Sequence, residues 1–339
     1  MRIAINGFGR IGRTFLRTLV SDHNAHKKIE VVAINVGPAA PEQSSYFFAY
    51  DSVMGVYPHA VEYKDGYLCV QTNSLGVVRI PVIAEKDAAK LPWKNLAVDW
   101  VVDCSGKYTH RAEAEIHLKA GAKKVLISAP AHDVDCTIVP GVNAQAYDTH
   151  KDVIVSLGSC TTNALLPLLK VISDHWGIES AMVTTTHAYT PSQALLDGFD
   201  GDDVRRGRAA ALNIVPASTG ADRMISEILP HLKGKIMANA LRVPVPKVSL
   251  VDVTWVGTKP VTRDQINAVF ASVAEKELHN ILEYCKAPLV SSDFAGNKHS
   301  VIVDAHLTMA VATMGKISGW YDNEWGYSCR LKDFLLTIA

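Results

Sequence analysis

The sequence predicts an α/β chain of two domains: a doubly wound domain, then an α+β domain with a largely antiparallel sheet. Three observations lead to this prediction. Short apolar strands alternate with helix-like segments in the first half, longer β-branched segments dominate the second half, and the change falls near Cys160. We therefore expect domains over residues 1–158 and 159–322, and a helix over 323–339 that packs back on the first domain.

The first half alternates strand and helix in the order that a mostly parallel sheet needs, with helices on both faces. Its first strand, "RIAING", leads into a helix, "IGRTFLRTLVSD". A later segment with helical periodicity, "HRAEAEIHLKAGA", contains a glycine near its end, which is a common signal for a helix C-terminus. The other predicted strands are "IEVVAIN", "VDWVVDCSG", "KKVLISAP" and "VIVSLGS".

The second half favours antiparallel pairing because its apolar segments are longer, β-branched and often alternating. One helix, "TRDQINAVFASVAEKEL", opens with Thr262 and Gln265 at capping-box spacing, and the last segment, "EWGYSCRLKDFLLTI", returns to helical periodicity. The predicted strands are "IESAMVTTTHAY", "KIMANALRVP", "SLVDVTWVGT" and "HSVIVDAHLTMAVATMGKISGWY".

Composition excludes several classes of function. Lys+Arg and Asp+Glu balance at 34 each, so no net field attracts nucleic acid or an anionic membrane. No apolar run approaches the roughly 18 residues of a membrane span, and the N-terminus lacks a signal peptide's apolar region. The six cysteines are scattered without a CxxC pair, which argues against a disulfide framework and a cysteine-rich zinc site. We expect a cytoplasmic protein without a metal.

A glycine-rich turn, "INGFGRIGR", follows the first strand and opens the first helix. Gly7, Gly9 and Gly12 have the G-x-G-x-x-G spacing. The first permits the tight turn, the second lets the backbone approach a pyrophosphate, and the third lets the helix pack on the strand. A glycine-rich surface turn is the plain alternative, but the strand–turn–helix context favours a Rossmann-type dinucleotide site.

The acidic residue that usually follows such a turn is absent. An Asp or Glu at the end of the second strand would hold the adenosine ribose hydroxyls, whereas here Asn35 is followed by Val36 and Gly37. Without a carboxylate, a 2′-phosphate meets no repulsion, but no Arg or Lys follows nearby in the sequence to attract one. The predicted cofactor is therefore NAD or NADP, with the choice open.

A single cysteine, Cys160, stands where the strand "VIVSLGS" meets a helix. The positive end of a helix dipole and its free N–H groups favour a thiolate there, and the same N–H groups suit an oxyanion on a carbonyl that the sulfur attacks. Most cysteines are small buried hydrophobes, which fits Cys69, Cys104 and Cys136. It fits Cys160 poorly, because its neighbours are polar. We expect Cys160 to be a nucleophile.

A thiol nucleophile needs a base, and one of the 13 histidines stands out. His187 ends the β-branched run "AMVTTTHAY" at the exit of a strand into a polar loop. A histidine satisfied at a strand end is the alternative. With Cys160 and a nicotinamide, His187 completes a reaction: the thiolate attacks an aldehyde, hydride transfer leaves a thioester, and a second nucleophile releases the acyl group.

At this point the sequence resembles the phosphorylating glyceraldehyde-3-phosphate dehydrogenase family over essentially its whole length. The resemblance rests on several motifs in the family's order: "INGFGRIGR", "SCTTN", "THAYT", "RRGRAAALNIVPASTGA", "LRVPVPKVSLVD", "PLVSSDF" and "WYDNEWGYS". It implies a homotetramer that acts in glycolysis or gluconeogenesis on glyceraldehyde 3-phosphate and inorganic phosphate.

The resemblance also implies roles for matching positions. Cys160 would be the nucleophile and His187 the base, while Asn323 would orient the nicotinamide carboxamide. Thr190 and Arg242 match the substrate-phosphate site, and either Arg206 or Arg208 should serve one of the two anions. The inorganic-phosphate site is matched by Ser159, Thr161, Thr219 and Gly220, and further cofactor contacts are expected at Arg10, Ile11, Asn35 and Ser128.

Some positions depart from the family's pattern. Leu157 and Gly158 replace Asn and Ala before the nucleophile, Pro191 and Ser192 follow "YT", and "LLDGFDGDDVRR" carries one extra residue. Two alternatives stay open: erythrose-4-phosphate dehydrogenase, which uses the same thiol chemistry, and a non-catalytic binding protein on the same fold. The phosphate-site residues favour the triose enzyme, and the complete catalytic set argues against a purely binding role.

Overall fold

The computed structural model describes residues 1–199 and 203–339. Part of the segment "LLDGFDGDDVRR", which is expected to carry one extra residue, therefore lies outside the described residues. The chain divides into two compact units. Unit 1 comprises Met1–Ile138, Ala144–Ser159 and Ser328–Ala339, and unit 2 comprises Val139–Asn143 and Cys160–Tyr327. The predicted domain ranges differ from these mainly at 139–143 and at the start of the last segment. None of the helices in the described ranges has the length and apolar character that a membrane span requires.

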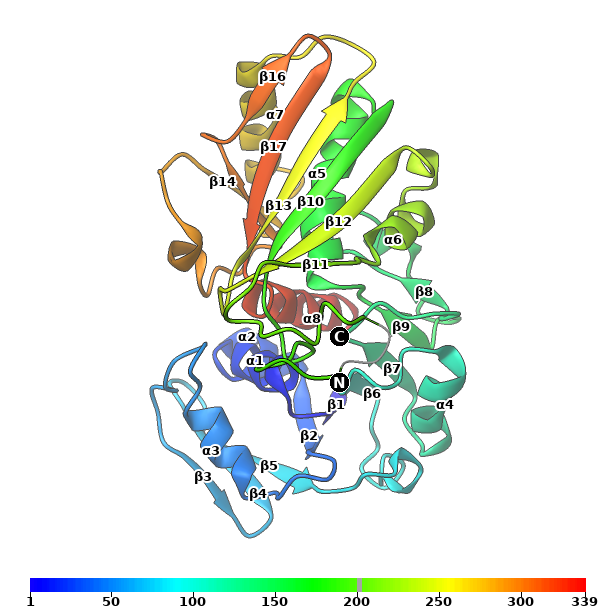
Figure 1. Ribbon diagram of the computed structural model, residues 1–339. Helices are drawn as coiled ribbons and strands as arrows, with labels where there is room; N and C mark the ends of the chain where they lie inside the picture. The colour runs from blue at the N-terminus through cyan, green and yellow to red at the C-terminus, as the bar shows by residue number, and fades with distance from the viewer. Residues whose placement is uncertain (200–202) are drawn as a thin grey trace. The chain divides into compact units, whose positions relative to one another are not determined.

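Unit 1 is built on a mostly parallel sheet in the order β3-β4-β5-β2-β1-β6-β7-β9-β8 (Figure 1). Its strands are β1 (Arg2–Asn6), β2 (Glu30–Asn35), β3 (Val61–Lys64), β4 (Tyr67–Thr72), β5 (Gly76–Ile83), β6 (Trp100–Asp103), β7 (Lys124–Ile127), β8 (Cys136–Thr137) and β9 (Ile154–Ser156). Its helices are α1 (Arg10–Val20), α2 (His23–Lys28), α3 (Gln43–Ala49), α4 (Arg111–Lys119) and most of α8 (Trp325–Ile338), with the short 3-10 helices η1 (Ala88–Lys90) and η2 (Ala144–Ala146).

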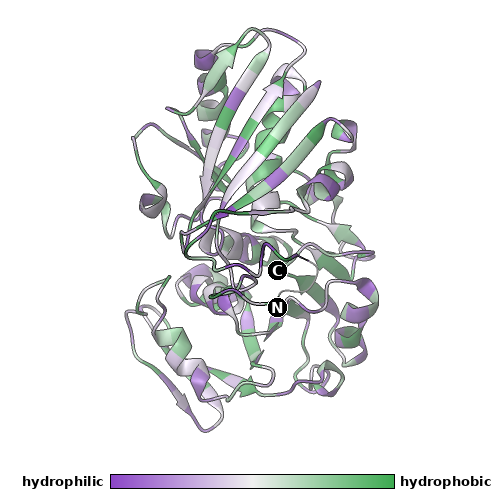
Figure 2. Ribbon diagram, viewed as in Figure 1, coloured by the Kyte–Doolittle hydropathy of each residue, from purple (hydrophilic) through white to green (hydrophobic). Residues whose placement is uncertain are grey.

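The strands of unit 1 are apolar because both faces of the sheet are covered. All four residues of β6 are buried, and the ribbons of β6, β7 and β9 are strongly hydrophobic in Figure 2. Helix α8 packs in this unit: Lys332 reaches Asp22 at 2.7 Å, and the Phe334 ring lies edge-on to Trp100. The strand–helix alternation in the sequence therefore reflects a buried sheet with helices on both faces, as expected.

An antiparallel meander, β3-β4-β5, extends this sheet and was not predicted. It turns at Asp65 and Gly66, which both have positive φ (52° and 83°), as a two-residue hairpin turn requires. The Asp-Gly pair between alternating segments is the signal that could have identified it. The meander joins the parallel sheet where β5 pairs with β2 at Ile34 and Asn35.

Unit 2 holds a second sheet in the order β11-β12-β10-β13-β17-β15-β14, with β16 paired to β17. Only β10·β12 and β14·β15 are parallel among its described pairs, so the fold class predicted from the sequence is confirmed. Its strands are β10 (Ser180–Ala188), β11 (Val215–Ala217), β12 (Ile236–Val243), β13 (Ser249–Val256), β14 (Leu282–Cys285), β15 (Val301–Asp304), β16 (Met309–Val311) and β17 (Met314–Tyr321). Its helices are α5 (Cys160–Trp176), α6 (Ala221–Ile228) and α7 (Arg263–Glu275), with η3 (Pro230–Leu232) and η4 (Ser291–Phe294).

Two sequence signals of unit 2 have different outcomes. The capping box at the start of α7 is present, with Thr262 and Gln265 bonding each other's backbone N–H groups. The long apolar segment 299–321 forms three strands instead of one, because the chain turns after Asp304 and again at Ala312, whose φ is 51°. A run of apolar residues fixes burial but does not fix where a strand ends.

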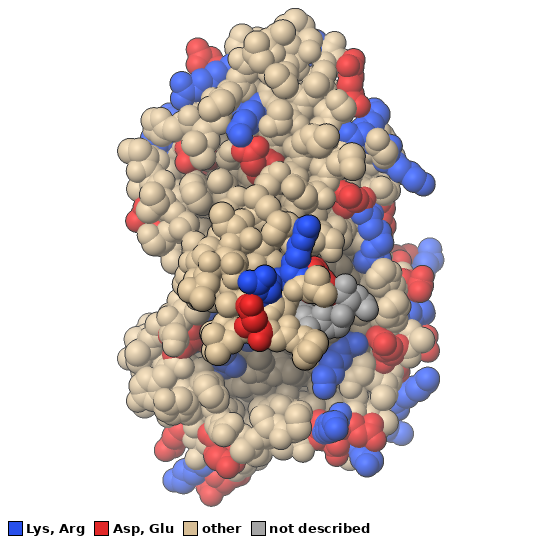
Figure 3. Space-filling view, in the orientation of Figure 1, with Lys and Arg blue, Asp and Glu red and all other residues tan. Residues whose placement is uncertain are grey.

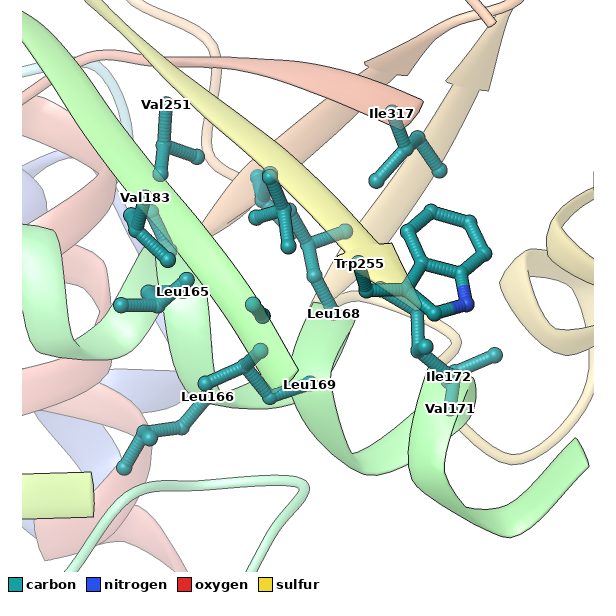
Figure 4. Close-up of a cluster of buried hydrophobic side chains, with 14 of the residues drawn as sticks. Leu165, Leu166, Leu168, Leu169, Val171, Ile172, Val183, Val251, Trp255 and Ile317 are labelled. Carbon is teal, nitrogen blue, oxygen red and sulfur yellow. The ribbon is translucent and has the colours of Figure 1, made fainter. Parts of the chain in front are cut away.

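The core of unit 2 anchors α5, the helix that begins with Cys160, the predicted nucleophile. Figure 4 shows leucines of α5, among them Leu165 and Leu168, packed against Val183 of β10 and Val251 of β13. All four side chains are buried. The helices cover one face of the sheet, and the other face exposes Met182 and Met237, each about two-thirds accessible. Figure 3 shows few charged side chains over β10, β12 and β13 on that outward face.

Candidate active site

The glycine turn of unit 1 connects β1 to α1 with little room for side chains. Gly7 has a φ of 91°, and a Cβ placed there would lie 2.7 Å from the Ser105 backbone. A Cβ at Gly12 would collide with the Gly7 carbonyl. Gly9, in contrast, has open space beside it and forms the N-cap of α1 without a side-chain cap. The turn therefore packs tightly on the sheet side and leaves backbone exposed on the other, as a phosphate-binding turn requires.

A cavity of about 400 Å³ lies beside this turn, at the carboxyl ends of β1, β2 and β6. This is where a doubly wound sheet binds its ligand. The cavity is lined by Asn6, Gly7, Phe8, Gly9, Arg13, Asn35, Val36, Gly37, Pro38, Ala39, Ala40, Gln43, Ser44, Phe47, Glu85, Lys86, Cys104, Ser105, Lys107 and Tyr108. Its size, glycine turn and mixed polar and aromatic lining fit a nucleotide.

The predicted cofactor residues differ in how they relate to this cavity. Gly7, Gly9 and Asn35 line it, whereas Arg10, Ile11, Gly12 and Ser128 do not. Arg10 forms an ion pair with Asp51 at 2.5 Å, and the Ser128 side chain hydrogen-bonds the thiol of Cys104, which lines the cavity. Asn323 belongs to unit 2, where its Oδ1 accepts from the backbone N–H of Val248 at 3.1 Å. Their cofactor roles stay predictions.

A buried polar chain lies at the ends of the three strands. Asn35 donates through Nδ2 to Oδ1 of Asn6 at 2.8 Å, and Asn6 donates to Asp103 Oδ2 at 2.7 Å. The Asp103 carboxylate, 1% exposed, also accepts from the backbone N–H and the hydroxyl of Ser105. His117 Nε2 lies 3.3 Å from the same carboxylate. Sequence reasoning missed this chain, because its members lie far apart in the sequence.

The nucleophile and base predicted from the sequence meet in unit 2. Cys160 is the first residue of α5, and its Sγ lies 3.5 Å from Nε2 of His187, near the end of β10. Gly158, before the nucleophile, has a φ of 62°, a conformation that favours glycine. This explains one departure from the family pattern: the turn into α5 passes through the left-handed region.

The imidazole of His187 is neutral in this environment. Burial, followed by the nearby Arg242 guanidinium, lowers the pKa of His187 to about 3. Nδ1 lies 2.6 Å from the Ala188 carbonyl, which only accepts, and 2.7 Å from Nη1 of Arg242, which only donates. The tautomer with its proton on Nδ1 toward Ala188 is the one that leaves Nε2 as an acceptor toward the thiol. A neutral imidazole with a free Nε2 lone pair is what a general base requires.

Burial opposes the thiolate that a helix start favours at Cys160, and burial outweighs the helix end. Burial raises the pKa of the Cys160 thiol, while Arg242 and hydrogen bonds from Thr161 oppose that shift without reversing it. The position of Cys160 at the start of α5 indicated only the effects that lower the pKa of its thiol. Desolvation could not be read from the flanking polar residues. The sulfur therefore depends on transfer of its proton to His187.

One arginine contacts His187, a second acts on the first through its charge, and a third pairs elsewhere. The parallel register of β10 and β12 places Arg242 opposite His187, with Nη1 2.7 Å from Nδ1. Burial and the charge of Arg206 both lower the pKa of Arg242, so the two guanidiniums repel each other. Arg208 instead pairs with Asp197 at 2.7 Å on the surface. Of the two arginines proposed from "RRGR", Arg206 is the one whose charge acts on Arg242, and the anion-binding role of either stays a prediction.

The remaining predicted anion ligands lie at helix ends or loops. Thr219 and Gly220 precede α6, where the Thr219 hydroxyl accepts from the Ala221 N–H at 3.3 Å. The Thr190 hydroxyl contacts that of Ser192 at 2.9 Å. Ser159 precedes α5 directly. These positions suit anions, but their roles stay predictions.

A tyrosine that sequence reasoning missed packs against His187 and hydrogen-bonds residues of α5 and β10. Tyr321, at the end of β17 and 1% exposed, brings its hydroxyl within 3.0 Å of Thr161 and 2.7 Å of Thr185. Its ring lies edge-on to His187 at 5.9 Å. Thr161, predicted to bind inorganic phosphate, therefore already uses its hydroxyl to tie α5 to the sheet. The motif "WYDNEWGYS" contains Tyr321, but the family resemblance implied a role only for Asn323.

The fold and these sites are those of a dinucleotide-binding protein in which a cysteine and a histidine, the predicted nucleophile and base, lie in contact. Comparison with known proteins makes this more specific. The NAD binding domain of glyceraldehyde 3-phosphate dehydrogenase matches residues 1–111, and the C-terminal domain of the same enzyme matches residues 159–323. The chain belongs to the glyceraldehyde 3-phosphate dehydrogenase family, which confirms the resemblance drawn from its motifs.

Similar curated proteins cover the chain from end to end. A protein of Mycobacterium leprae named glyceraldehyde-3-phosphate dehydrogenase is 47% identical over 337 residues, which is 99% of this chain and 97% of the relative. One of Kitasatospora aureofaciens with the same name is 46% identical and covers 100% and 99%. Glyceraldehyde-3-phosphate dehydrogenase 1 of Streptomyces avermitilis is 44% identical and covers 100% and 98%.

Proposed function

We propose that this protein is a phosphorylating glyceraldehyde-3-phosphate dehydrogenase, which converts glyceraldehyde 3-phosphate, inorganic phosphate and NAD or NADP to 1,3-bisphosphoglycerate and the reduced cofactor. The observation that carries the proposal is the 3.5 Å contact between Sγ of Cys160 and Nε2 of His187 at the start of α5. Family membership supports the choice of substrate. Unit 1 would bind the dinucleotide, and unit 2 would carry the chemistry.

The covalent chemistry takes place on Cys160. Its sulfur bonds to the aldehyde carbon while its proton passes to Nε2 of His187 and on to the carbonyl oxygen, which gives a hemithioacetal. The N–H groups at the start of α5 stabilise the negative charge on that oxygen. His187 then takes the hydroxyl proton as the carbon loses a hydride, and a thioester remains. When bound, the nicotinamide supplies the hydride acceptor.

Release of the product uses the second anion. Inorganic phosphate attacks the thioester carbon, the carbon–sulfur bond breaks, and the leaving sulfur recovers a proton from His187. Arg242 and Arg206 would hold the substrate phosphate, because an anion between them relieves their mutual repulsion. Such an anion also offsets the charge of Arg242, so substrate would raise the pKa of His187 toward its working range. Ser159, Thr190, Thr219 and Gly220 remain the proposed hydroxyl and backbone donors to the two phosphates.

A cytoplasmic homotetramer is the proposed setting of this activity. The six cysteines are free thiols, which suits a reducing compartment. The outward face of the unit 2 sheet exposes Met182 and Met237 and carries few charges, which suits a surface that packs against a second copy of the chain (Figure 3). Light scattering of the purified protein tests the tetramer.

Initial rates test the proposed reaction. The protein is assayed with glyceraldehyde 3-phosphate and phosphate, first with NAD and then with NADP, and reduced nicotinamide is followed by absorbance. Phosphate-dependent turnover is expected with at least one cofactor. A strong preference for erythrose 4-phosphate as substrate would contradict the proposal, and so would absence of turnover with both aldehydes.

A further inference from the structure

The amide of Asn323 is held at one end and has no partner at the other. Its Oδ1 accepts from the backbone N–H of Val248 at 3.1 Å, just beyond the last pair of β13 with β17, Ser249 with Tyr321. Because only the oxygen of an amide accepts from an N–H, this contact fixes the direction of Nδ2 as well. Asn323 is 6% exposed, yet within residues 1–199 and 203–339 its Nδ2 has no hydrogen-bond partner. Such donors are rare in native proteins, so Nδ2 fits the nicotinamide contact that the family resemblance implies.

Val248, the donor to Asn323, has a strained backbone. Its φ is 66°, in the left-handed region that a β-branched residue rarely adopts. Its side chain is buried and packs in a small apolar cluster with Phe294 and Ile302. Strain of this kind persists only where neighbouring contacts over-determine the backbone. The direction of the Val248 N–H, and with it the orientation of the Asn323 amide, therefore depends on what holds the residues beside Val248.

Lys247 supplies one of these contacts. Its Nζ lies 3.1 Å from Oδ2 of Asp322, and the two side chains are 10% and 0% exposed. The Asp322 carboxylate is itself fixed by three backbone N–H donors, those of Gly296, Glu324 and Trp325. A buried carboxylate whose cation is removed keeps an uncompensated charge, which is strongly unfavourable. The ion pair therefore ties residue 247 to residue 322, directly beside the contact between Val248 and Asn323.

We infer that Lys247 is a positioning residue: through its ion pair with Asp322 it holds Val248 so that the Asn323 amide keeps Nδ2 directed at the nicotinamide carboxamide. The inference rests on the proposed dehydrogenase function and deepens it. Without the ammonium, residues 247 and 248 relax toward an unstrained backbone, and the Val248 N–H leaves Oδ1. The amide is then free to turn. Loss of one oriented hydrogen bond corresponds to a decrease of about tenfold in affinity for the nicotinamide-bearing ligand.

Calorimetry with two matched ligands tests this without turnover. The probes are the dinucleotide that gives the faster initial rate and ADP-ribose with the same 2′ substituent, which lacks the nicotinamide. Lys247→Met should weaken binding of the dinucleotide about tenfold and leave the affinity for the ADP-ribose probe unchanged, because only the nicotinamide reaches Asn323. Lys247→Arg keeps a cation opposite Asp322 and should recover most of the loss. An unchanged dinucleotide affinity in Lys247→Met, or an equal loss for both probes, would overturn the inference and leave the proposed function intact.

A double-mutant cycle separates positioning from general destabilisation. Asn323→Ala should weaken dinucleotide binding about as much as Lys247→Met, and the two changes together should add nothing, since both remove the same contact. Lys170→Met is the control: it breaks another Lys–Asp pair of unit 2, with Asp174 at 2.6 Å on the surface of α5, and should keep both affinities. Additive losses would overturn the inference. Failure of the wild-type protein to bind either probe would contradict the proposed function and the inference together.

Discussion

The strand ends of the two sheets use polar side chains in opposite ways. In unit 1, Asn6, Asn35 and Asp103 end neighbouring strands, and hydrogen bonds join them in one buried chain. In unit 2, His187 and Arg242 lie near the ends of neighbouring strands; the charge of Arg242 keeps His187 neutral, and the charge of Arg206 opposes that of Arg242. The first arrangement is satisfied without ligand. The second is electrostatically unfavourable until an anion enters.

This difference separates a site that holds its shape from a site prepared for reaction. A saturated amide such as Asn35 fixes loops, because every departure from its geometry breaks a buried hydrogen bond. Two guanidiniums near a neutral imidazole cost stability but leave charge available for phosphate. The comparison predicts that substitutions at the first kind of site reduce stability, and that substitutions at the second reduce catalysis.

The largest expected effect is at the nucleophile. Cys160→Ser should lower kcat by about 10⁴-fold or more, because a serine hydroxyl near a neutral imidazole is a far weaker nucleophile than a thiol in this reaction. Steady-state rates measure this, with circular dichroism to show that the fold is kept. Cys285→Ala is the control, because this buried cysteine has no contact with Cys160 or His187 in the site described, and the variant should keep its activity. A Cys160→Ser protein of wild-type activity would remove the basis of the mechanism.

The next effect distinguishes the arginines. Arg242→Met should reduce kcat/KM for glyceraldehyde 3-phosphate by about 100-fold, since it removes a charge-assisted phosphate contact. With unphosphorylated glyceraldehyde the loss should be much smaller. Arg208→Met is the matched control, because that side chain pairs with Asp197 on the surface. Equal losses in both variants would show that the guanidinium beside His187 has no special role.

The third prediction tests the hydrogen-bonded chain of side chains at the strand ends of unit 1. Asn35→Ala should lower the free energy of unfolding by about 2 kcal/mol, because the buried Asn6 and the partly buried Gly37 and Glu85 lose their hydrogen bonds. Urea denaturation gives the value. Its kcat at saturating cofactor should remain near wild type, while the KM for cofactor rises. A stability equal to wild type would mean that the chain of amides does not hold the loops.

The smallest effect concerns acid. The folded-state pKa of His187, about 3, lies below the ordinary histidine value, so the unfolded chain binds more protons between roughly pH 6.5 and 3. Stability due to this residue is therefore present above pH 6.5 and is lost as the pH falls, by at most about 1.4 kcal/mol per pH unit. His187→Gln should lessen the dependence of unfolding free energy on pH between 6.5 and 4. An unchanged slope would indicate that His187 is protonated in the folded state.

Local signals in the sequence were sufficient for much of this protein. Glycine spacing identified the turn after β1, because only glycine fits where a Cβ would strike Ser105 or the Gly7 carbonyl. Thr262 and Gln265 marked the start of α7, because a capping box acts within one helical turn. Cys160 and His187 were found from the polar surroundings of a thiol and the end of a β-branched strand. These are interactions over a few residues, which a sequence displays directly.

The tertiary structure decided what depends on distant pairing and on burial. The register of β10 against β12 places Arg242 at His187, and the buried amide of Asn35 holds the loop at Glu85. Desolvation set the pKa of Cys160 against the expectation from its helix position. The sequence by itself determined the alternation of elements and the glycine turn, and it singled out Cys160 and His187 as the predicted nucleophile and base. Their protonation and their charged neighbours were decided by packing, because electrostatic interactions depend on distance and dielectric surroundings that sequence separation does not give.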